Sequence, residues 1–203
     1  MRRGAGTRDR GAPLPGASRL RRGLVWAISA LATAILAVRF LSGAAGTAAL
    51  ARDSACRTLG PDPLSPELHG LAPDFELPDM HGKRWSLRAL RGRPVLVSFW
   101  ASWCQPCVEE MPSLEVLVRR LGDRAAVLAV SVDDDWDAIR KFFPRGTPLT
   151  VLLDSSREVP ARYGTSKFPE SFLVDPSGRV RHAFINQRDW SIPEATACIE
   201  NAR

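Results

Sequence analysis

The chain has 203 residues, of which 45% are apolar and 25% are charged. This composition excludes an extensively disordered protein and a protein with many membrane spans. The formal net charge is +6, and residues 1–23 account for all of it with seven Arg and one Asp. The remaining residues carry balanced charge, which argues against a nucleic-acid partner.

An uncharged apolar run follows the basic tail of residues 1–22. Residues 23–38 read GLVWAISALATAILAV, and Arg39 can snorkel to the far interface, so a membrane span can cover residues 23–41. The Arg-rich flank predicts a cytoplasmic N-terminus. We expect a signal anchor that holds the chain as a single-pass protein in the inner membrane, with its C-terminal domain in the periplasm or extracytoplasmic space. The alternative is a cleaved signal peptide that releases the domain into the periplasm.

Residues 42–71 are rich in Gly, Ala and Pro and show no periodicity, which predicts a flexible tether. Strand and helix patterns then alternate over residues 72–203. Strands are expected at residues 74–77, 83–87, 94–101, 125–132, 149–153, 171–175 and 179–185, and helices at residues 105–121, 135–143, 158–163 and 190–201. This order, with a hairpin first, predicts an α/β sandwich with a mixed sheet.

The segment WCQPC at residues 103–107 carries the strongest chemical signal, because it joins a buried strand to the start of a helix. Two cysteines three residues apart in a first helical turn can close a small disulfide loop. The sulfur of Cys104 faces the helix N-terminus, where unpaired N–H groups favour a thiolate. The motif predicts thiol–disulfide exchange, in which Cys104 attacks a disulfide and Cys107 resolves the mixed disulfide. A zinc site is disfavoured because no second CxxC or HxxxH pair exists, and we expect no cofactor.

Three stretches around this motif carry a family resemblance. Residues 72–112 read APDFELPDMHGKRWSLRALRGRPVLVSFWASWCQPCVEEMP, residues 127–133 read VLAVSVD, and residues 163–180 read YGTSKFPESFLVDPSGRV. They are similar to the TlpA/ResA branch of the thioredoxin superfamily, the membrane-anchored extracytoplasmic thiol–disulfide oxidoreductases. The resemblance implies a thioredoxin-like sandwich with an N-terminal hairpin extension.

The resemblance also implies how substrate binds. The bond between Phe168 and Pro169 would be a cis peptide in a loop that faces the disulfide, although a plain loop proline fits the residue pattern alone. The backbone of Phe168 would pair with an extended substrate segment beside Cys104. Trp103 is expected to cover the sulfurs.

The acid/base group of the reaction is less clearly marked. Thioredoxins carry a buried Asp on the strand before the motif, and Ser98 stands at the matching position. The resemblance points instead to Asp134 as the acid/base. The alternative is that residues 133–135, all Asp, form a solvated loop and a helix N-cap.

Cys56 and Cys198 remain outside the motif. They either pair, which would pin the tether to the domain in an oxidising compartment, or serve separately, with Cys198 as a small buried residue and Cys56 free or intermolecular. We expect a monomer that reduces disulfides in exported proteins and takes electrons from a membrane-side donor. Cytochrome c maturation is implied by the resemblance alone.

Two other functions remain open. A peroxiredoxin-like peroxidase shares the early sequence pattern, but Cys104 occupies the place of the Thr three residues before the peroxidatic cysteine. A dithiol that binds copper or a protein partner without catalysis is the other alternative.

Overall fold

The computed structural model describes residue 26, residues 31–39 and residues 55–202. The predicted basic tail lies outside these residues, as do residues 23–25, 27–30, 40 and 41 of the predicted membrane span. Residues 31–39 are helical, and within the described ranges no helix is both long enough and apolar enough to cross a membrane. The signal anchor therefore stays a prediction.

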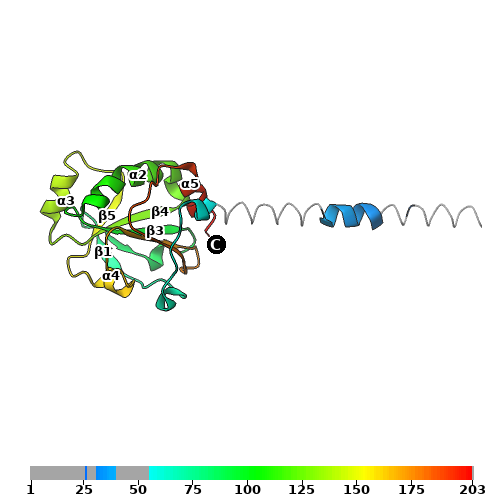
Figure 1. The fold of residues 1–203 in the computed structure, drawn as a ribbon, viewed down its shortest axis with the longest axis horizontal. Helices are drawn as coiled ribbons and strands as arrows, with labels where there is room; N and C mark the ends of the chain where they lie inside the picture. The colour runs from blue at the N-terminus through cyan, green and yellow to red at the C-terminus, as the bar shows by residue number, and fades with distance from the viewer. Residues whose placement is uncertain (1–25, 27–30, 40–54, 203) are drawn as a thin grey trace, which may run out of the picture. The chain divides into compact units, whose positions relative to one another are not determined.

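A five-stranded mixed sheet with the order β5-β4-β3-β6-β7 forms the centre of the domain (Figure 1). Its strands are β3 (Val95–Trp100), β4 (Ala126–Ser131), β5 (Thr150–Leu153), β6 (Glu170–Val174) and β7 (Val180–Ile185). β3, β4 and β5 run parallel, whereas β6 is antiparallel to β3 and to β7. Every residue of β3 and β4 is buried, as expected of strands covered on both faces.

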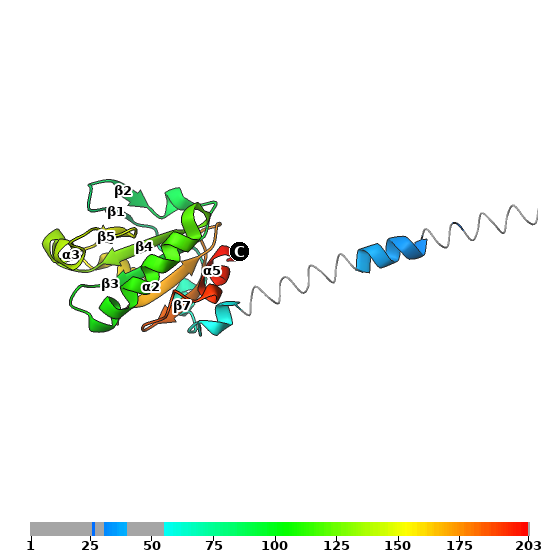
Figure 2. The same cartoon turned by 90° about the horizontal axis from the view of Figure 1, so that it is seen from above.

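Helices cover both faces of this sheet. α2 (Gln105–Leu121) and α5 (Pro193–Glu200) lie side by side on one face, and α4 (Glu158–Arg162) lies on the other (Figures 1 and 2). α3 (Trp136–Phe142) packs on the α2 side through Ile139. The side chains of β3 alternate between two hydrophobic clusters, because successive residues of a strand point to opposite faces.

The predicted hairpin extension is present. β1 (Glu76–Pro78) pairs antiparallel with β2 (Arg84–Ser86). The carboxylate of Asp79 accepts the backbone N–H groups of His81 and Lys83 in the turn, and Gly82 has φ +80°. Three short 3-10 helices complete the domain, η1 (Pro66–Leu68), η2 (Arg88–Leu90) and η3 (Gly122–Arg124).

The predicted strands and helices of the domain are all observed, with small differences at their ends. The helix predicted at residues 105–121 has those bounds in the structure. The last helix begins at Pro193 rather than at residue 190, because Trp190 is fully buried in the core and Pro is favoured in a first helical turn.

The tether predicted for residues 42–71 does not extend to residue 71. Residues 55–58 form a helical turn, Cys56 and Leu59 are buried in the core on the α2 side, and Leu68 is buried on the opposite side. Asp62 forms a β-bridge with Ala183 of β7. Residues 55–71 therefore pack against the domain and do not form an extended tether.

Candidate active site

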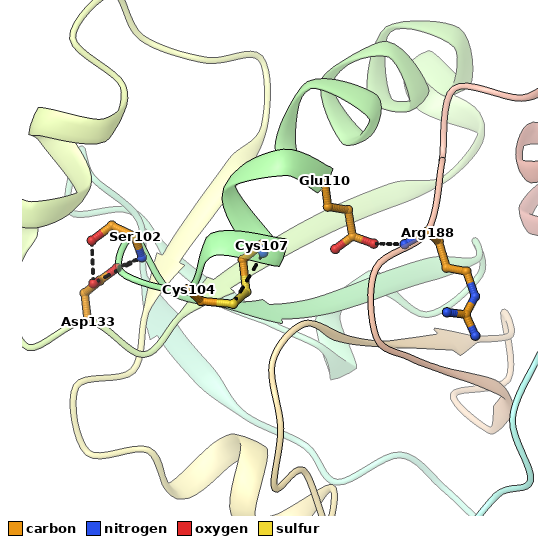
Figure 3. Close-up of a disulfide and its surroundings, with 6 residues drawn as sticks. All are labelled: Ser102, Cys104, Cys107, Glu110, Asp133 and Arg188. Carbon is orange, nitrogen blue, oxygen red and sulfur yellow. Dashed lines mark hydrogen bonds between the residues drawn. A yellow bond between two sulfur atoms is a disulfide. The ribbon is translucent and has the colours of Figure 1, made fainter.

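The motif WCQPC lies at the carboxyl end of β3, where the chain turns into α2 (Figure 3). Cys104 is the N-cap residue of α2, with φ −88° and ψ 104°, and Pro106 occupies the first turn. Pro is accepted there because its missing N–H would have had no intrahelical partner. Cys104 and Cys107 form a disulfide with the Cα atoms 5.2 Å apart, so the predicted pair is joined in this structure.

The two cysteines differ in exposure. Cys104 is 7% exposed and Cys107 is fully buried. The backbone N–H of Cys107 donates to the sulfur of Cys104 over 3.3 Å. Hydrogen-bond donors and the positive end of a helix stabilise a thiolate at this position. The geometry therefore allows a substrate to approach Cys104 and shields Cys107.

A buried carboxylate fixes the loop just before Cys104. Asp133 is 1% exposed and accepts the backbone N–H of Ser102 over 3.0 Å and its hydroxyl over 2.8 Å (Figure 3). It also accepts the hydroxyl of Ser131, the last residue of β4, over 2.7 Å. The position of residue 102, two before Cys104, is thus tied to the end of the neighbouring strand.

The bond between Phe168 and Pro169 is cis, as the resemblance implies. The ring of Trp103 is edge-on to that of Phe168, with centroids 6.2 Å apart. Trp103 is 62% exposed, so an apolar surface faces solvent beside the motif. The roles of these three residues in binding substrate stay predictions.

The three consecutive Asp residues have different environments. Asp134, the predicted acid/base, has an 89% exposed side chain that pairs with Arg157 over 3.1 Å. The carboxylate of Asp135 caps α3 by accepting the N–H groups of Asp137 and Ala138. The capping alternative is therefore confirmed for Asp135, and Asp133 is the buried member of the run.

Sequence reasoning missed Glu110, which is 1% exposed and lies three residues after Cys107 on α2 (Figure 3). Its Oε1 accepts the backbone N–H of Arg188 over 3.0 Å and the indole N–H of Trp190 over 2.6 Å. Its Oε2 is buried with no hydrogen-bond partner among the described residues. Burial raises the pKa of Glu110 to about 7, against the opposing effects of these donors and of the Arg188 charge.

A sequence signal for Glu110 does exist. The buried face of α2 includes Cys107, Met111, Leu114 and Leu117, and residue 110 falls on the same face. A lone carboxyl on an otherwise apolar helical stripe marks a buried acid. Ser98, at the position where thioredoxins have their Asp, is also fully buried and leaves that site without a carboxyl.

Cys56 and Cys198 form a second disulfide, which resolves the alternatives left open by the sequence. Both residues lie in the core on the α2 side, and Cys198 belongs to α5. This bond links residue 56 covalently to the last helix of the domain.

Comparison with known proteins agrees with this geometry. A family model described as the AhpC/TSA family matches residues 69–183, more than half of the chain. The chain belongs to the AhpC/TSA family. The match spans the hairpin, the cysteine motif and the loop of the cis bond, and it includes four of the five sheet strands in full.

Similar proteins indicate which kind of AhpC/TSA protein this chain resembles. Thiol-disulfide oxidoreductase ResA of Bacillus thuringiensis (strain Al Hakam) is 31% identical over 119 residues, which are 58% of this chain and 69% of that protein. ResA of Bacillus subtilis (strain 168) is 35% identical over 111 residues, which are 54% and 62% of the two chains. A crystal structure of a putative thiol:disulfide interchange protein DsbE from Chlorobium tepidum superposes with a TM-score of 0.56 at 32% identity, over 62% of this chain and 89% of that one.

These findings establish a thioredoxin-like fold and an AhpC/TSA member with ResA-type homologues. The protein is a thiol–disulfide oxidoreductase whose exchange chemistry belongs to the CxxC pair Cys104–Cys107.

Proposed function

We propose that Cys104 is the nucleophile and Cys107 the resolving thiol of a disulfide reductase. The difference in exposure between the two sulfurs, at a helix start that favours a thiolate, is the observation that carries this assignment. The Cys104 thiolate attacks one sulfur of a substrate disulfide, and the other substrate sulfur leaves as a thiolate. Cys107 then attacks Cys104, the second substrate thiolate leaves, and the protein is oxidised by two electrons to the disulfide seen here.

We assign to Glu110 the role of accepting the proton of the Cys107 thiol. A thiol attacks only after deprotonation, and Cys107 has no exposed surface from which water could take the proton. Glu110 follows it by less than one helical turn on the same face, and a pKa of about 7 suits a group that must both accept and release a proton near neutral pH. Asp134, the candidate from the sequence, is a surface residue paired with Arg157, which favours Glu110.

The cellular setting proposed here rests on the N-terminal sequence and on the second disulfide. Residues 23–41 would anchor the chain in the inner membrane, or serve as a cleaved signal, and the domain would lie in the periplasm or extracytoplasmic space. A buried structural disulfide such as Cys56–Cys198 is typical of an oxidising compartment. The substrates would be disulfides of exported proteins, with cytochrome c maturation as the specific pathway and a membrane-side dithiol protein as electron donor.

The test is a trapping experiment with the two single-cysteine variants. Cys107→Ser retains the nucleophile but not the resolving thiol, so it should accumulate mixed disulfides with extracytoplasmic proteins. Cys104→Ser is the matched control and should trap none. The wild-type chain should reduce insulin, and both variants should lose that activity. Trapping by Cys104→Ser instead would reverse the two roles, and rapid peroxide consumption without insulin reduction would replace the assignment with a peroxidase.

A further inference from the structure

The guanidinium of Arg188 is surrounded by acceptors from two distant parts of the chain. Its Nε donates to the carbonyl of Leu59 over 2.8 Å, and its Nη2 donates to the carbonyl of Gly60 over 3.0 Å and to the carboxylate of Asp62 over 3.1 Å. Its Nη1 donates to the carbonyl of Ile185 over 2.8 Å. One side chain therefore joins residues 59–62 to the loop after β7.

The same Nη1 also donates to the carbonyls of the two residues that precede Arg188, over 3.2 Å and 3.1 Å. These bonds hold the guanidinium against the loop that contains Arg188, in which Asn186 has φ 67°. The shape of this loop sets the direction of the Arg188 backbone N–H. That N–H donates to Oε1 of Glu110 (Figure 3). The side chain thus fixes the loop, and the loop's main chain holds the buried acid.

The segment that receives Arg188 is itself held at both ends. Cys56 is bonded to Cys198 of α5. At the other end Asp62 forms a β-bridge with Ala183, and its carboxylate accepts the N–H of Ile185 over 2.7 Å. The carbonyls of residues 59 and 60 therefore have fixed positions, which is the condition for a preorganised arginine site.

We propose that Arg188 is a positioning residue for Glu110, and that residues 56–62, secured by the Cys56–Cys198 disulfide, hold Arg188 in place. This inference rests on the proton-carrying role proposed above for Glu110. It makes the reactivity of the Cys104–Cys107 pair depend on residues 56–62, which precede all strands of the domain in the sequence.

The charged side chains that act on Glu110, or that lie beside Arg188, come from three parts of the chain. Arg188 comes from the loop after β7 and lowers the pKa of Glu110 by its charge and its N–H. Asp62 comes from the N-terminal segment and is paired with Arg188. Glu109 of α2 and Asp189 line a surface pocket together with Arg188. Loss of the Arg188 side chain should therefore raise the pKa of Glu110 further.

The test follows the resolving step in the full chain purified in detergent. Brief reduction opens Cys104–Cys107 while mass measurement checks that Cys56–Cys198 stays closed. Reaction with the chromogenic disulfide DTNB then releases one thionitrobenzoate when Cys104 attacks and a second when Cys107 resolves. The rate of the second release, measured against pH, reports the proton transfer from Cys107. Cys107→Ser should show the first release only.

In this assay Glu110→Gln should remove the inflection near neutral pH. Arg188→Met should shift the inflection upward by about one pH unit, the usual scale for loss of an opposite charge with its hydrogen bonding. In the Glu110→Gln background, Arg188→Met should leave the pH profile of the second release unchanged. A general loss of stability would instead alter the profile in both backgrounds. Arg140→Met, which removes an exposed ion pair with Asp137 on α3, is the matched control and should leave the profile unchanged.

Cys56→Ser/Cys198→Ser is a second route to the same result if Arg188→Met does not fold, and it should shift the inflection in the same direction. An unchanged profile in folded Arg188→Met or in the double serine variant overturns the coupling, while the proposed role of Glu110 stands. An inflection that survives in Glu110→Gln overturns that role and this inference with it. An equal shift by Arg188→Met with and without Glu110 also overturns the inference.

Discussion

At the scale of single residues, two buried carboxyls behave in opposite ways near the cysteine motif. Asp133 accepts hydrogen bonds from two serines and holds the loop before Cys104. Glu110 has donors on one oxygen only, and its other oxygen is buried without a hydrogen-bond partner among the described residues. A fully bonded carboxylate is suited to a structural role, whereas a poorly bonded buried one is suited to exchanging a proton.

The Glu110 carboxyl should make stability depend on pH. Its pKa is about 7 in the folded protein against an ordinary value of 4.5, so the folded state binds the extra proton between these values. The free energy of unfolding should therefore fall as pH rises from 4.5 to 7, by up to about 3 kcal/mol from this group. The free energy of unfolding of Glu110→Gln should not show this fall with pH. Urea denaturation of the oxidised wild-type and variant chains at pH 4.5, 6 and 7.5 measures the difference. A stability difference between the two proteins that does not vary with pH would contradict the prediction.

Asp133→Asn should loosen the loop before Cys104. The amide has one acceptor in place of two and presents an NH2 group to donors, so we expect a loss of about 1–3 kcal/mol in the free energy of unfolding. Insulin reduction should fall more than stability alone explains, since residue 102 leads directly to Cys104. Asp137→Asn, at an exposed ion pair, is the matched control. Equal effects of the two variants on activity would argue against the role given to Asp133.

At the scale of elements, the junction of β3 and α2 is the feature that makes the chemistry available. β3 is buried along its whole length, so its end is fixed, and α2 starts there with the N–H of Cys107 directed at the sulfur of Cys104. α2 stops at Gly122, which has φ 53° and ψ −131°, a conformation that favours glycine. This stop lets the chain turn back into β4, whose end carries the serine and carboxylate that hold the motif.

Gly122→Ala should therefore destabilise the domain through its backbone alone. A Cβ at this position would meet no atom within 4 Å, so steric crowding is not the cause. We expect a loss of about 1–3 kcal/mol in the free energy of unfolding, from the strained conformation. Gly70→Ala, also open around its Cβ but without positive φ, should change stability little. Thermal unfolding of the two variants side by side measures the difference, and equal melting temperatures would refute it.

At the scale of the whole molecule, the second disulfide determines how far the domain extends. It joins residues 142 positions apart and brings the segment from residue 56 into the core. Cross-links over long loops restrict the unfolded chain most, so this bond should contribute more than the active-site disulfide, which spans three positions.

Cys56→Ser/Cys198→Ser should accordingly lower the free energy of unfolding by about 2–5 kcal/mol. Cys104→Ser/Cys107→Ser is the matched control and should cost clearly less. Urea denaturation of both double variants under non-reducing conditions is the measurement. A larger loss in the control would show that the active-site disulfide, and not the long-range one, stabilises the fold.

The sequence by itself determined the elements and the reactive pair. Strand and helix periodicity can be recognised from residues close together in the sequence. The chemistry of a CxxC at a helix start likewise needs only four consecutive positions. The same local information predicted the mixed sheet and its hairpin.

Only the tertiary structure decided which partners bind the buried acids and which cysteines form the second disulfide. Glu110 is held by residues about 80 positions away, and Cys56 pairs with a cysteine in the last helix. Among Asp133, Asp134 and Asp135, one is buried, one is paired at the surface and one caps a helix. Identical neighbours cannot be told apart by their residue type, because the direction in which the backbone points each side chain is set by how the end of β4 packs against the loop before Cys104.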